Sequence, residues 1–158
     1  DALATATPVS PCATYPNEAA WLADPVAVAG LVFVGDAAGW DDPITGQGLS
    51  IALRDIRVLS ELLTATDRWD RAALAPYGQE RGARMRRLRF CSAMSASIAN
   101  EFGPAADERR LRYRELASAD RRFGLARFAA FVGPDALPSQ AFTPAAWDRV
   151  FAPLGAST

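Results

Sequence analysis

The chain has 158 residues, of which half are apolar and 22% are charged, a composition typical of a globular domain that can bury a core. Its net charge of −1 gives no general attraction to nucleic acid or membranes, and no apolar run approaches the roughly 20 residues of a membrane span. The absence of His excludes Ser-His-Asp triads, His general bases and most zinc sites.

The first elements predicted along the chain are irregular. Residues 1–29 are rich in Pro, Ala and Thr, which predicts short extended pieces and turns rather than a helix. Residues 31–34 form a short apolar, partly β-branched run, which predicts a buried strand. The segment 35–48 is rich in Gly, and such a loop carries a cost in backbone entropy that suggests a function.

Two helices are predicted next. Apolar residues recur at three and four positions and predict an amphipathic helix from about residue 49 to residue 65: Leu49, Ala52, Leu53, Ile56, Leu59, Leu62 and Leu63. Asp67 or Asp70 can cap the following segment, and Pro76 suits the first turn of a long second helix. One face of this second helix is expected to carry Met85, Leu88, Cys91, Ser95, Ile98 and Phe102.

The rest of the chain is also expected to be helical up to about residue 131. Gly103-Pro104 ends the long helix, Gly133-Pro134 ends the last one, and the tail is predicted to be irregular. The arginines of the stretch 81–89 are expected to form a solvated helix surface, with an anion or nucleic-acid patch as the alternative.

The cysteines and the N-terminus bear on location. Cys12 and Cys91 have no CxxC spacing, which favours free thiols in a reducing compartment over a disulfide. No basic region followed by an apolar stretch indicates a signal peptide, so the expected location is the cytoplasm. Because the chain starts with Asp1 rather than Met, we expect it to be processed, truncated or cut from a longer polypeptide.

Chemistry is expected in the loop 35–50. Asp36 follows the predicted strand, where open α/β sheets place ligand contacts, and Gly46 and Gly48 leave backbone N–H groups bare at a helix start. The spacing does not fit a dinucleotide fingerprint, since Ile51 stands where a third Gly would be required. On spacing alone, the glycines could equally serve only a tight turn.

Other candidate residues are weaker. Asp41 and Asp42 are adjacent acids without further oxygen ligands, so we predict no metal site. Among the aromatic residues, Trp40 has the best claim to a substrate pocket because it lies in the loop, whereas core packing is nearly as good an explanation for Tyr15 and Trp21.

The segment from Gly35 to Ser50 resembles the second FAD-binding motif of the aromatic-hydroxylase (p-hydroxybenzoate hydroxylase-like) flavoprotein family. That motif is Gly-Asp-Ala-Ala, a variable span with a Pro, Gly-Gln-Gly, and a helix with an internal Asp. The matching positions are Gly35, Asp36, Ala37, Ala38, Pro43, Gly46, Gln47, Gly48 and Asp55. Two positions depart from it, because Gly39-Trp40 replaces a common His and Ser50 replaces a common Asn.

The resemblance implies a site for FAD and the residues that form it. Asp36 would accept a hydrogen bond from a ribitol hydroxyl, Pro43 would lie beside the isoalloxazine ring, and N–H groups around Gly48 would face the flavin N1–C2=O edge. The implied cofactor-binding residues are Gly35, Asp36, Ala37, Pro43, Gly46, Gln47, Gly48, Leu49 and Ser50. No side chain is assigned as catalytic, because the cofactor carries the chemistry.

The resemblance also implies the fold class, α+β to mostly α, as the C-terminal part of a Rossmann-like FAD-binding fold followed by long helices. Residues 1–66 would be the flavin-contacting segment and residues 67–158 a C-terminal helical region. The family's Gly-rich pyrophosphate loop and its middle Asp-Gly motif do not occur here. The expected partners are therefore the missing N-terminal part of the polypeptide and a small organic substrate, with no nucleic acid and no membrane.

The implied function is an FAD-dependent monooxygenase that hydroxylates a small aromatic or polyketide-like substrate with NAD(P)H as reductant. Alternatives are a related flavin-dependent halogenase or reductase, and a non-catalytic helical interaction module. By itself, this segment is expected to bind FAD weakly and to be inactive.

Overall fold

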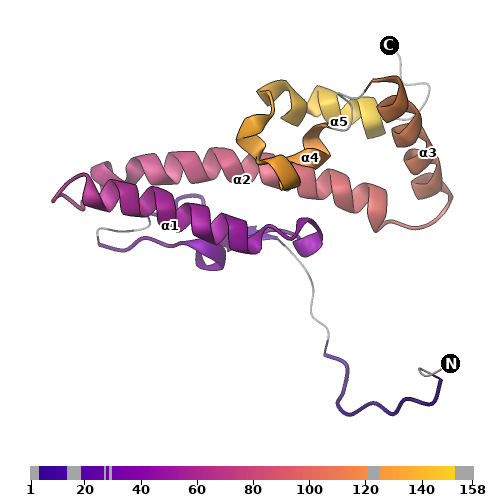
Figure 1. Ribbon diagram of the computed structural model, residues 1–158, viewed down its shortest axis with the longest axis horizontal. Helices are drawn as coiled ribbons and strands as arrows, with labels where there is room; N and C mark the ends of the chain where they lie inside the picture. The colour runs from indigo at the N-terminus through magenta and orange to yellow at the C-terminus, as the bar shows by residue number, and fades with distance from the viewer. Residues whose placement is uncertain (1–3, 14–18, 27, 29, 121–124, 152–158) are drawn as a thin grey trace.

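One long helix organises the molecule. The computed structural model describes residues 4–13, 19–26, 28, 30–120 and 125–151. Helix α2 (Arg71–Ala99) runs the length of the body, and α1 (Gly48–Thr64) lies antiparallel beside its first half (Figure 1). Helix α4 (Leu125–Val132) packs on the second half, and α3 (Pro104–Ala119) packs with α5 (Pro144–Phe151) at the far end.

The extended structure of the described residues is small. Strands β1 (Ala20–Trp21) and β2 (Gly39–Trp40) pair antiparallel, with Trp21 opposite Gly39. A Cβ at Gly39 would lie 2.4 Å from the Cα of Trp21, so this pairing requires glycine. Short 3₁₀ turns connect the elements: Gly35–Ala38 (η1), Pro43–Thr45 (η2), Pro134–Ala136 (η4) and Ser139–Phe142 (η5).

The prediction of a buried strand at residues 31–34 is wrong. Leu31 forms only an isolated bridge with Val28 and is exposed, and residues 32–34 have no regular secondary structure. A strand needs a neighbour to satisfy its backbone groups. Here the N–H of Phe33 donates instead to the carbonyl of Pro25, and its carbonyl accepts from the Tyr77 hydroxyl at 2.8 Å.

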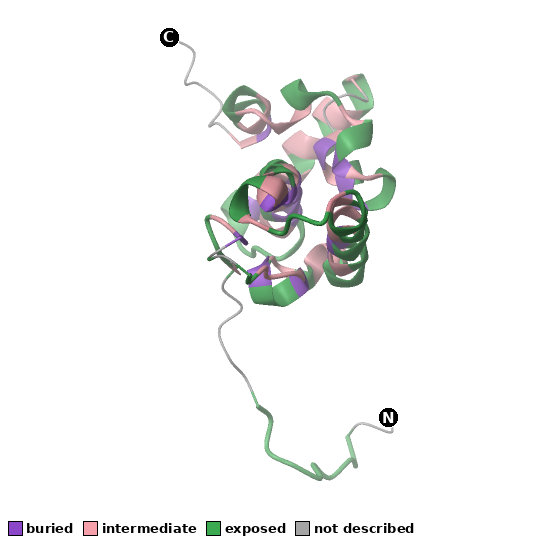
Figure 2. Ribbon diagram, turned by 90° about the vertical axis from the view of Figure 1, so that its left-hand side faces the viewer, coloured by how far each residue is buried: buried purple, intermediate pink, exposed green. Residues whose placement is uncertain are grey.

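Helix α1 is confirmed from its start at Gly48 to its end at Thr64, but its predicted apolar face is only partly correct. Ile51 and Asp55 are buried, and the partly buried Val58, Leu59 and Leu62 pack against the cluster of Val26, Leu74 and Tyr77. The side chains of Leu49, Leu53 and Ile56 are exposed because they lie on the side of the helix turned away from α2. Figure 2 shows the exposed and buried sides of the helices.

Helix α2 begins earlier than predicted. The Asp70 side chain caps it by accepting a hydrogen bond from the N–H of Ala73 at 2.9 Å, so Pro76 lies inside the helix rather than in its first turn. The predicted buried positions Met85, Leu88, Cys91, Ser95 and Ile98 are confirmed. Phe102 lies beyond the helix end and is 90% exposed, so its assignment to this face of the helix was wrong.

The C-terminal helices correct one further prediction. Helix α3 starts at Pro104 and α4 ends at Val132, as expected from Gly103-Pro104 and Gly133-Pro134. The tail is not irregular throughout, because residues 144–151 form α5. Thr143 accepts a hydrogen bond from the N–H of Ala146, and Trp147 packs edge-to-face on Phe90 of α2.

The described residues are mostly helical, and none of their helices is long and apolar enough to cross a membrane. The contact between α1 and α2 crosses the predicted boundary between residues 66 and 67. Descent from a Rossmann-like FAD-binding fold stays a prediction.

Candidate functional site

A cavity of about 570 Å³ opens where the loop after η1 meets the start of α1. Five of the predicted cofactor-binding residues line it: Asp36, Pro43, Gly46, Gln47 and Gly48. Trp40, Asp41, Asp42, Thr45 and Ile51 complete its wall. Of the other predicted residues, Gly35 is buried behind the wall, and Ala37, Leu49 and Ser50 are exposed beside it. The structure thus gathers most of the predicted residues, and their contacts with a flavin stay a prediction.

The three carboxylates of this cavity differ in their partners. Asp41 accepts a hydrogen bond from the Ser92 hydroxyl at 2.7 Å, and Asp42 accepts one from the N–H of Ile44 at 2.8 Å, which caps η2. Asp36 is exposed, and its carboxylate makes no hydrogen bond or ion pair within the described ranges. Its carboxylate is therefore available to a ligand.

The start of α1 supplies donors to the same cavity. The first N–H groups of a helix have no intrahelical acceptor, and here the N–H of Ile51 is the first to bond, to the Gln47 carbonyl at 2.9 Å. The backbone at Gly46 is left-handed with φ of 64°, so the turn itself explains this glycine. A Cβ at Gly48 would meet no atom within 4 Å, so packing within the described residues does not explain that one.

The Gln47 side chain fastens the loop to the C-terminal helices. Its amide nitrogen donates to the carbonyl of Ala130 in α4 at 2.5 Å and to the carbonyl of Thr45 at 3.3 Å. These two bonds use both amide hydrogens. The cofactor role predicted for Gln47 would therefore fall to its backbone or to its amide oxygen.

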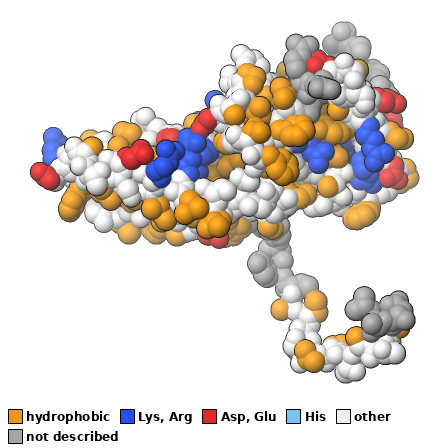
Figure 3. Space-filling view, in the orientation of Figure 1, with side chains coloured by type: hydrophobic (Ala, Val, Ile, Leu, Met, Phe, Trp, Pro, Cys, Tyr) orange, Lys and Arg blue, Asp and Glu red, His pale blue; other side chains and the backbone are white. Residues whose placement is uncertain are grey.

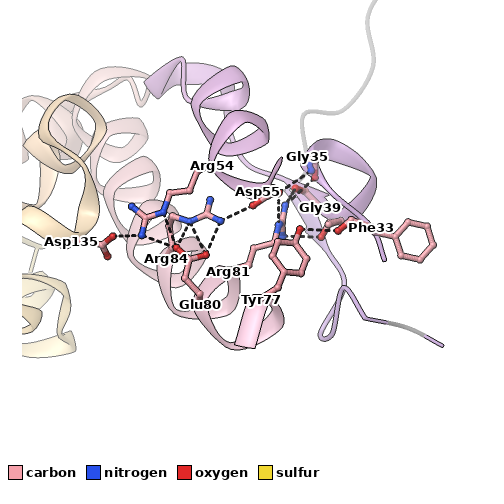
Figure 4. A network of polar contacts seen from close by, with 11 residues as sticks. Phe33, Gly35, Gly39, Arg54, Asp55, Tyr77, Glu80, Arg81, Arg84 and Asp135 are labelled. Carbon is pink, nitrogen blue, oxygen red and sulfur yellow. Dashed lines mark hydrogen bonds and ion pairs between the residues drawn. The ribbon is translucent and has the colours of Figure 1, made fainter. Parts of the chain in front are cut away.

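A buried ionic cluster of Asp55, Arg81 and Arg84 holds the Gly-Asp segment, residues 35–39, in place (Figure 4). The fully buried Asp55 carboxylate accepts from the N–H of Gly35 at 2.9 Å, from Arg81 at 2.8 Å and from Arg84 at 2.6 Å. The Arg81 guanidinium also donates to the carbonyls of the segment, at 2.9 Å to Gly35 and at 3.1 Å to Ala38 and to Gly39. The shape of residues 35–39 is therefore set by side chains from α1 and α2.

The cluster extends outward as alternating charges. Arg84 pairs with Glu80, Glu80 pairs with Arg54, and Arg54 reaches Asp135 next to α4 (Figure 4). Tyr77 lies beside the cluster, and its hydroxyl donates a hydrogen bond to the carbonyl of Phe33. Burial and the neighbouring Asp55 charge raise the pKa of Tyr77. Every buried charge in this cluster thus has an opposite charge beside it, which is the condition for keeping ions in a core.

The expectation that Arg81 and Arg84 belong to a solvated helix surface is therefore wrong. Both are buried, because Asp55 provides a charge partner inside the fold. The sequence did contain an indication of this. The two arginines continue the spacing of three and four that connects Tyr77 to Leu88 and Cys91, so they fall on the buried stripe of α2.

The remaining candidates are placed as follows. Trp40 lines the cavity and is half-exposed. Trp21 lies under Arg89, whose guanidinium carbon is 4.2 Å from the centroid of the Trp21 ring. Tyr15 lies outside the described residues. Cys12 and Cys91 are both free thiols, as predicted. No group of three or more possible metal ligands occurs among the residues with described positions.

The cavity thus offers the N-terminus of α1 and the Asp36 carboxylate, which has no partner among the described residues. A family model described as squalene epoxidase matches residues 7–90, more than half of the chain. The chain belongs to the squalene epoxidase family.

Two curated relatives are also similar to the chain. A ubiquinone hydroxylase of Rhodospirillum rubrum is 37% identical over 87 residues, which cover 51% of this chain and 20% of that protein. The mitochondrial squalene epoxidase 2 of Arabidopsis thaliana is 37% identical over 78 residues, 49% of this chain and 13% of that protein. The chain therefore aligns with a fifth or less of each relative's length, and the search of solved structures gave no significant match.

Proposed function

We propose that this chain forms the flavin-contacting part of a flavin-dependent monooxygenase. The family supports an oxygen-inserting enzyme, because a hydroxylase and an epoxidase, the activities in the names of the two relatives, both add oxygen to an organic molecule. The observation that carries the proposal is the free Asp36 carboxylate, which shares a cavity with the N-terminus of α1.

The residues around the cavity fit the flavin and ribitol portion of FAD. Asp36 is a free acceptor for a ribitol hydroxyl, and the open space at Gly48 lets a ring approach the backbone closely. A helix N-terminus stabilises negative charge by about 0.3–2 kcal/mol, which suits the N1–C2=O edge of a reduced flavin.

The charge of the cavity also suits this portion of FAD rather than the pyrophosphate. Asp36, Asp41 and Asp42 all line it, and their negative charges would repel a pyrophosphate more strongly than a reduced flavin, which carries a single negative charge. When bound, the flavin would supply the oxygen-transfer chemistry. The chain's own contribution is to hold the ring and to fix the Gly-Asp segment through Asp55 and Arg81.

Finer parts of the proposal rest on the resemblance of residues 35–50 to the aromatic hydroxylases. They are a small aromatic or polyketide-like substrate, NAD(P)H as reductant, and an upstream part of the same polypeptide that binds the pyrophosphate. Pro43, which lines the cavity, would lie beside the flavin ring.

The test is an FAD titration, followed by flavin fluorescence, of the longest native polypeptide that carries residues 1–158. Asp36→Ala should weaken FAD binding by about 1.5–3 kcal/mol, the contribution of a hydrogen bond to a charged group, or roughly tenfold to a hundredfold in Kd. Asp67→Ala removes an exposed carboxylate that does not line the cavity and should leave the affinity unchanged. Equal FAD affinity in the wild type and in Asp36→Ala would show that Asp36 does not hold the cofactor.

A further inference from the structure

A second cavity of about 520 Å³ borders the same loop. Pro43, Thr45 and Gly46 line both cavities, so the η2 turn is a shared wall. The other walls come from the C-terminal helices and from α2: Ser95, Ala99, Tyr113, Arg127, Phe128, Ala130 and Phe131, with Ile44 from the loop. Its volume lies in the range of small-molecule sites.

The walls of this second cavity are largely apolar, and two of their aromatic rings are exposed to solvent. Phe128 is 52% exposed and Phe131 is 83% exposed, both on α4. Figure 3 shows hydrophobic side chains gathered over α4 and its junction with α2. Rings that project beside a cavity can cover the apolar body of a ligand at little cost in side-chain entropy.

One cation in this cavity has no acidic partner among the residues that the structure describes. The Nε atom of Arg127 is buried and makes no hydrogen bond in the described structure, and its guanidinium carbon lies 5.2 Å from the ring centroid of Tyr113. Described salt bridges pair Arg54, Arg81 and Arg84 with acids, but none includes Arg127. No acidic side chain is among the residues that line the cavity.

We propose that this second cavity binds an apolar carboxylic acid, such as an aromatic acid, with Arg127 as the receptor of its carboxylate. A guanidinium matches a carboxylate with two parallel hydrogen bonds, and the Tyr113 ring lies against the guanidinium of Arg127. Phe128 and Phe131 then flank the apolar body of the ligand. Because η2 borders both cavities, such an acid would lie next to the flavin ring, and its role as the substrate rests on the proposed function.

A third cavity, of about 430 Å³, provides the matched control. It also contains one arginine, Arg149, but the acidic Asp120 lines it as well. An acid ligand would meet a carboxylate of like charge there. Removing the cation of this cavity should therefore leave the binding of an organic acid unchanged.

The experiment measures binding of 2-naphthoate and of its uncharged analogue 2-naphthylmethanol to the purified protein by calorimetry or ligand-observed NMR. We expect a preference for 2-naphthoate, a loss of about tenfold or more in its affinity with Arg127→Met, and no change with Arg149→Met. Equal affinity for the two probes, or 2-naphthoate affinity that is unaffected by Arg127→Met, would overturn the proposal.

Two further variants keep the result interpretable if Arg127→Met folds poorly. Arg127→Lys keeps the charge without the planar fork and should retain part of the preference for the acid. Phe128→Ala removes an exposed ring and should weaken both probes alike. Full affinity for 2-naphthoate in both of these variants would also overturn the proposal.

An FAD titration of the same variants separates this proposal from the proposed function. Arg127→Met should leave FAD affinity unchanged, because Arg127 does not line the first cavity. If the wild type bound 2-naphthoate through Arg127 but did not bind FAD, the proposed function would fail and the acid site would stand. If the wild type bound FAD but showed no preference for 2-naphthoate, the acid site would fail and the proposed function would stand.

Discussion

Asp36 and Asp55 belong to the same sequence motif but hold their charges in opposite surroundings. The Asp55 carboxylate is fully buried and accepts hydrogen bonds from one backbone N–H and two guanidinium groups. Asp36 is exposed at the rim of a cavity, and its carboxylate has no partner in the described part of the chain. We infer that Asp55 maintains the loop and that Asp36 is left free for the ligand.

Asp55→Asn should destabilise the protein strongly. The substitution removes a buried negative charge and leaves Arg81 without its acidic partner, and breaking a buried ion pair in this way costs about 3–5 kcal/mol. Urea unfolding followed by circular dichroism measures the loss. Glu61→Gln is the control, because it breaks only an exposed pair with Arg57 and should cost less than about 1 kcal/mol. Similar losses in the two variants would show that the buried cluster is not a stabilising feature.

Substitutions of two glycines of the loop should separate folding from binding. Gly39→Ala places a Cβ 2.4 Å from the Cα of Trp21 and should disrupt the pairing of β1 with β2 and lower the melting temperature. Gly48→Ala adds a Cβ in open space, so the melting temperature should not fall while FAD binding weakens. Thermal unfolding and flavin titration of both variants test this. A Gly48→Ala protein with lower stability but full FAD affinity would assign Gly48 to the turn alone.

At the residue scale, the residues of the cofactor loop could be predicted from the sequence, but the buried ion pairs that hold this loop could not. Asp36, Gly46 and Gly48 could be selected because their residue types and spacing define a motif. Arg81 and Arg84 were assigned to the surface because charged residues are seldom buried. Their burial depends on Asp55, a residue of another helix, and this tertiary pairing is not visible in the local pattern.

At the element scale, the start of α2 has a titratable cap. A hydrogen bond from the N–H of Ala73, with a further one from Arg68, holds the pKa of Asp70 below its ordinary value of 3.8. A carboxyl group whose pKa is lowered by folding stabilises the fold above its unfolded pKa. That contribution is lost as the pH falls through the pKa of the folded state.

Asp70→Ala should therefore lower the melting temperature at pH 7, and its difference from the wild type should shrink as the pH falls below about 3.8. Thermal unfolding between pH 7 and pH 2.5 measures this difference. Asp70→Asn keeps a side-chain acceptor that does not titrate, and it should retain more of the cap at the lowest pH. A difference between wild type and Asp70→Ala that stayed constant over this range would contradict the role of the charge.

Elements formed by interactions between residues close in sequence were predicted more accurately than elements that depend on distant residues. Helices α1 and α3 were predicted at their starts because Gly48 and Gly103-Pro104 act within one turn of chain. The strand expected at residues 31–34 failed because strand pairing needs a neighbour that local sequence does not reveal. Helix α5 was not predicted, because the surrounding sequence is rich in Pro and Ala and was interpreted as irregular. Its start at Thr143-Pro144 is nevertheless typical of a helix.

At the scale of the whole molecule, α1 carries an uncovered apolar row, defined here as Leu49, Leu53 and Ile56. All three side chains are exposed on one side of the helix. Contiguous apolar surface of this kind favours association in water. The opposite side of α1 is already packed against α2, so this row adds nothing to the described core.

Replacing Leu53 and Ile56 by Ser should reduce self-association of the purified chain without lowering its helix content. Light scattering coupled to size exclusion measures the mass, and circular dichroism measures the helix content. Val58→Ser and Leu62→Ser on the packed side of α1 form the matched control and should instead destabilise the fold. An unchanged oligomeric mass after removal of the exposed pair would show that the row does not drive association.

The amide of Gln47 has a consequence for communication between the two cavities beside η2. It connects the turn that precedes α1 to the carbonyl of Ala130, a residue that lines the second cavity, so we expect a displacement of α4 to reach the wall of the first cavity. Occupancy of one cavity should then alter the affinity of the other, and thermodynamic linkage requires the effect to be equal in both directions. In Gln47→Ala, this coupling between the two ligands should be weaker than in the wild type.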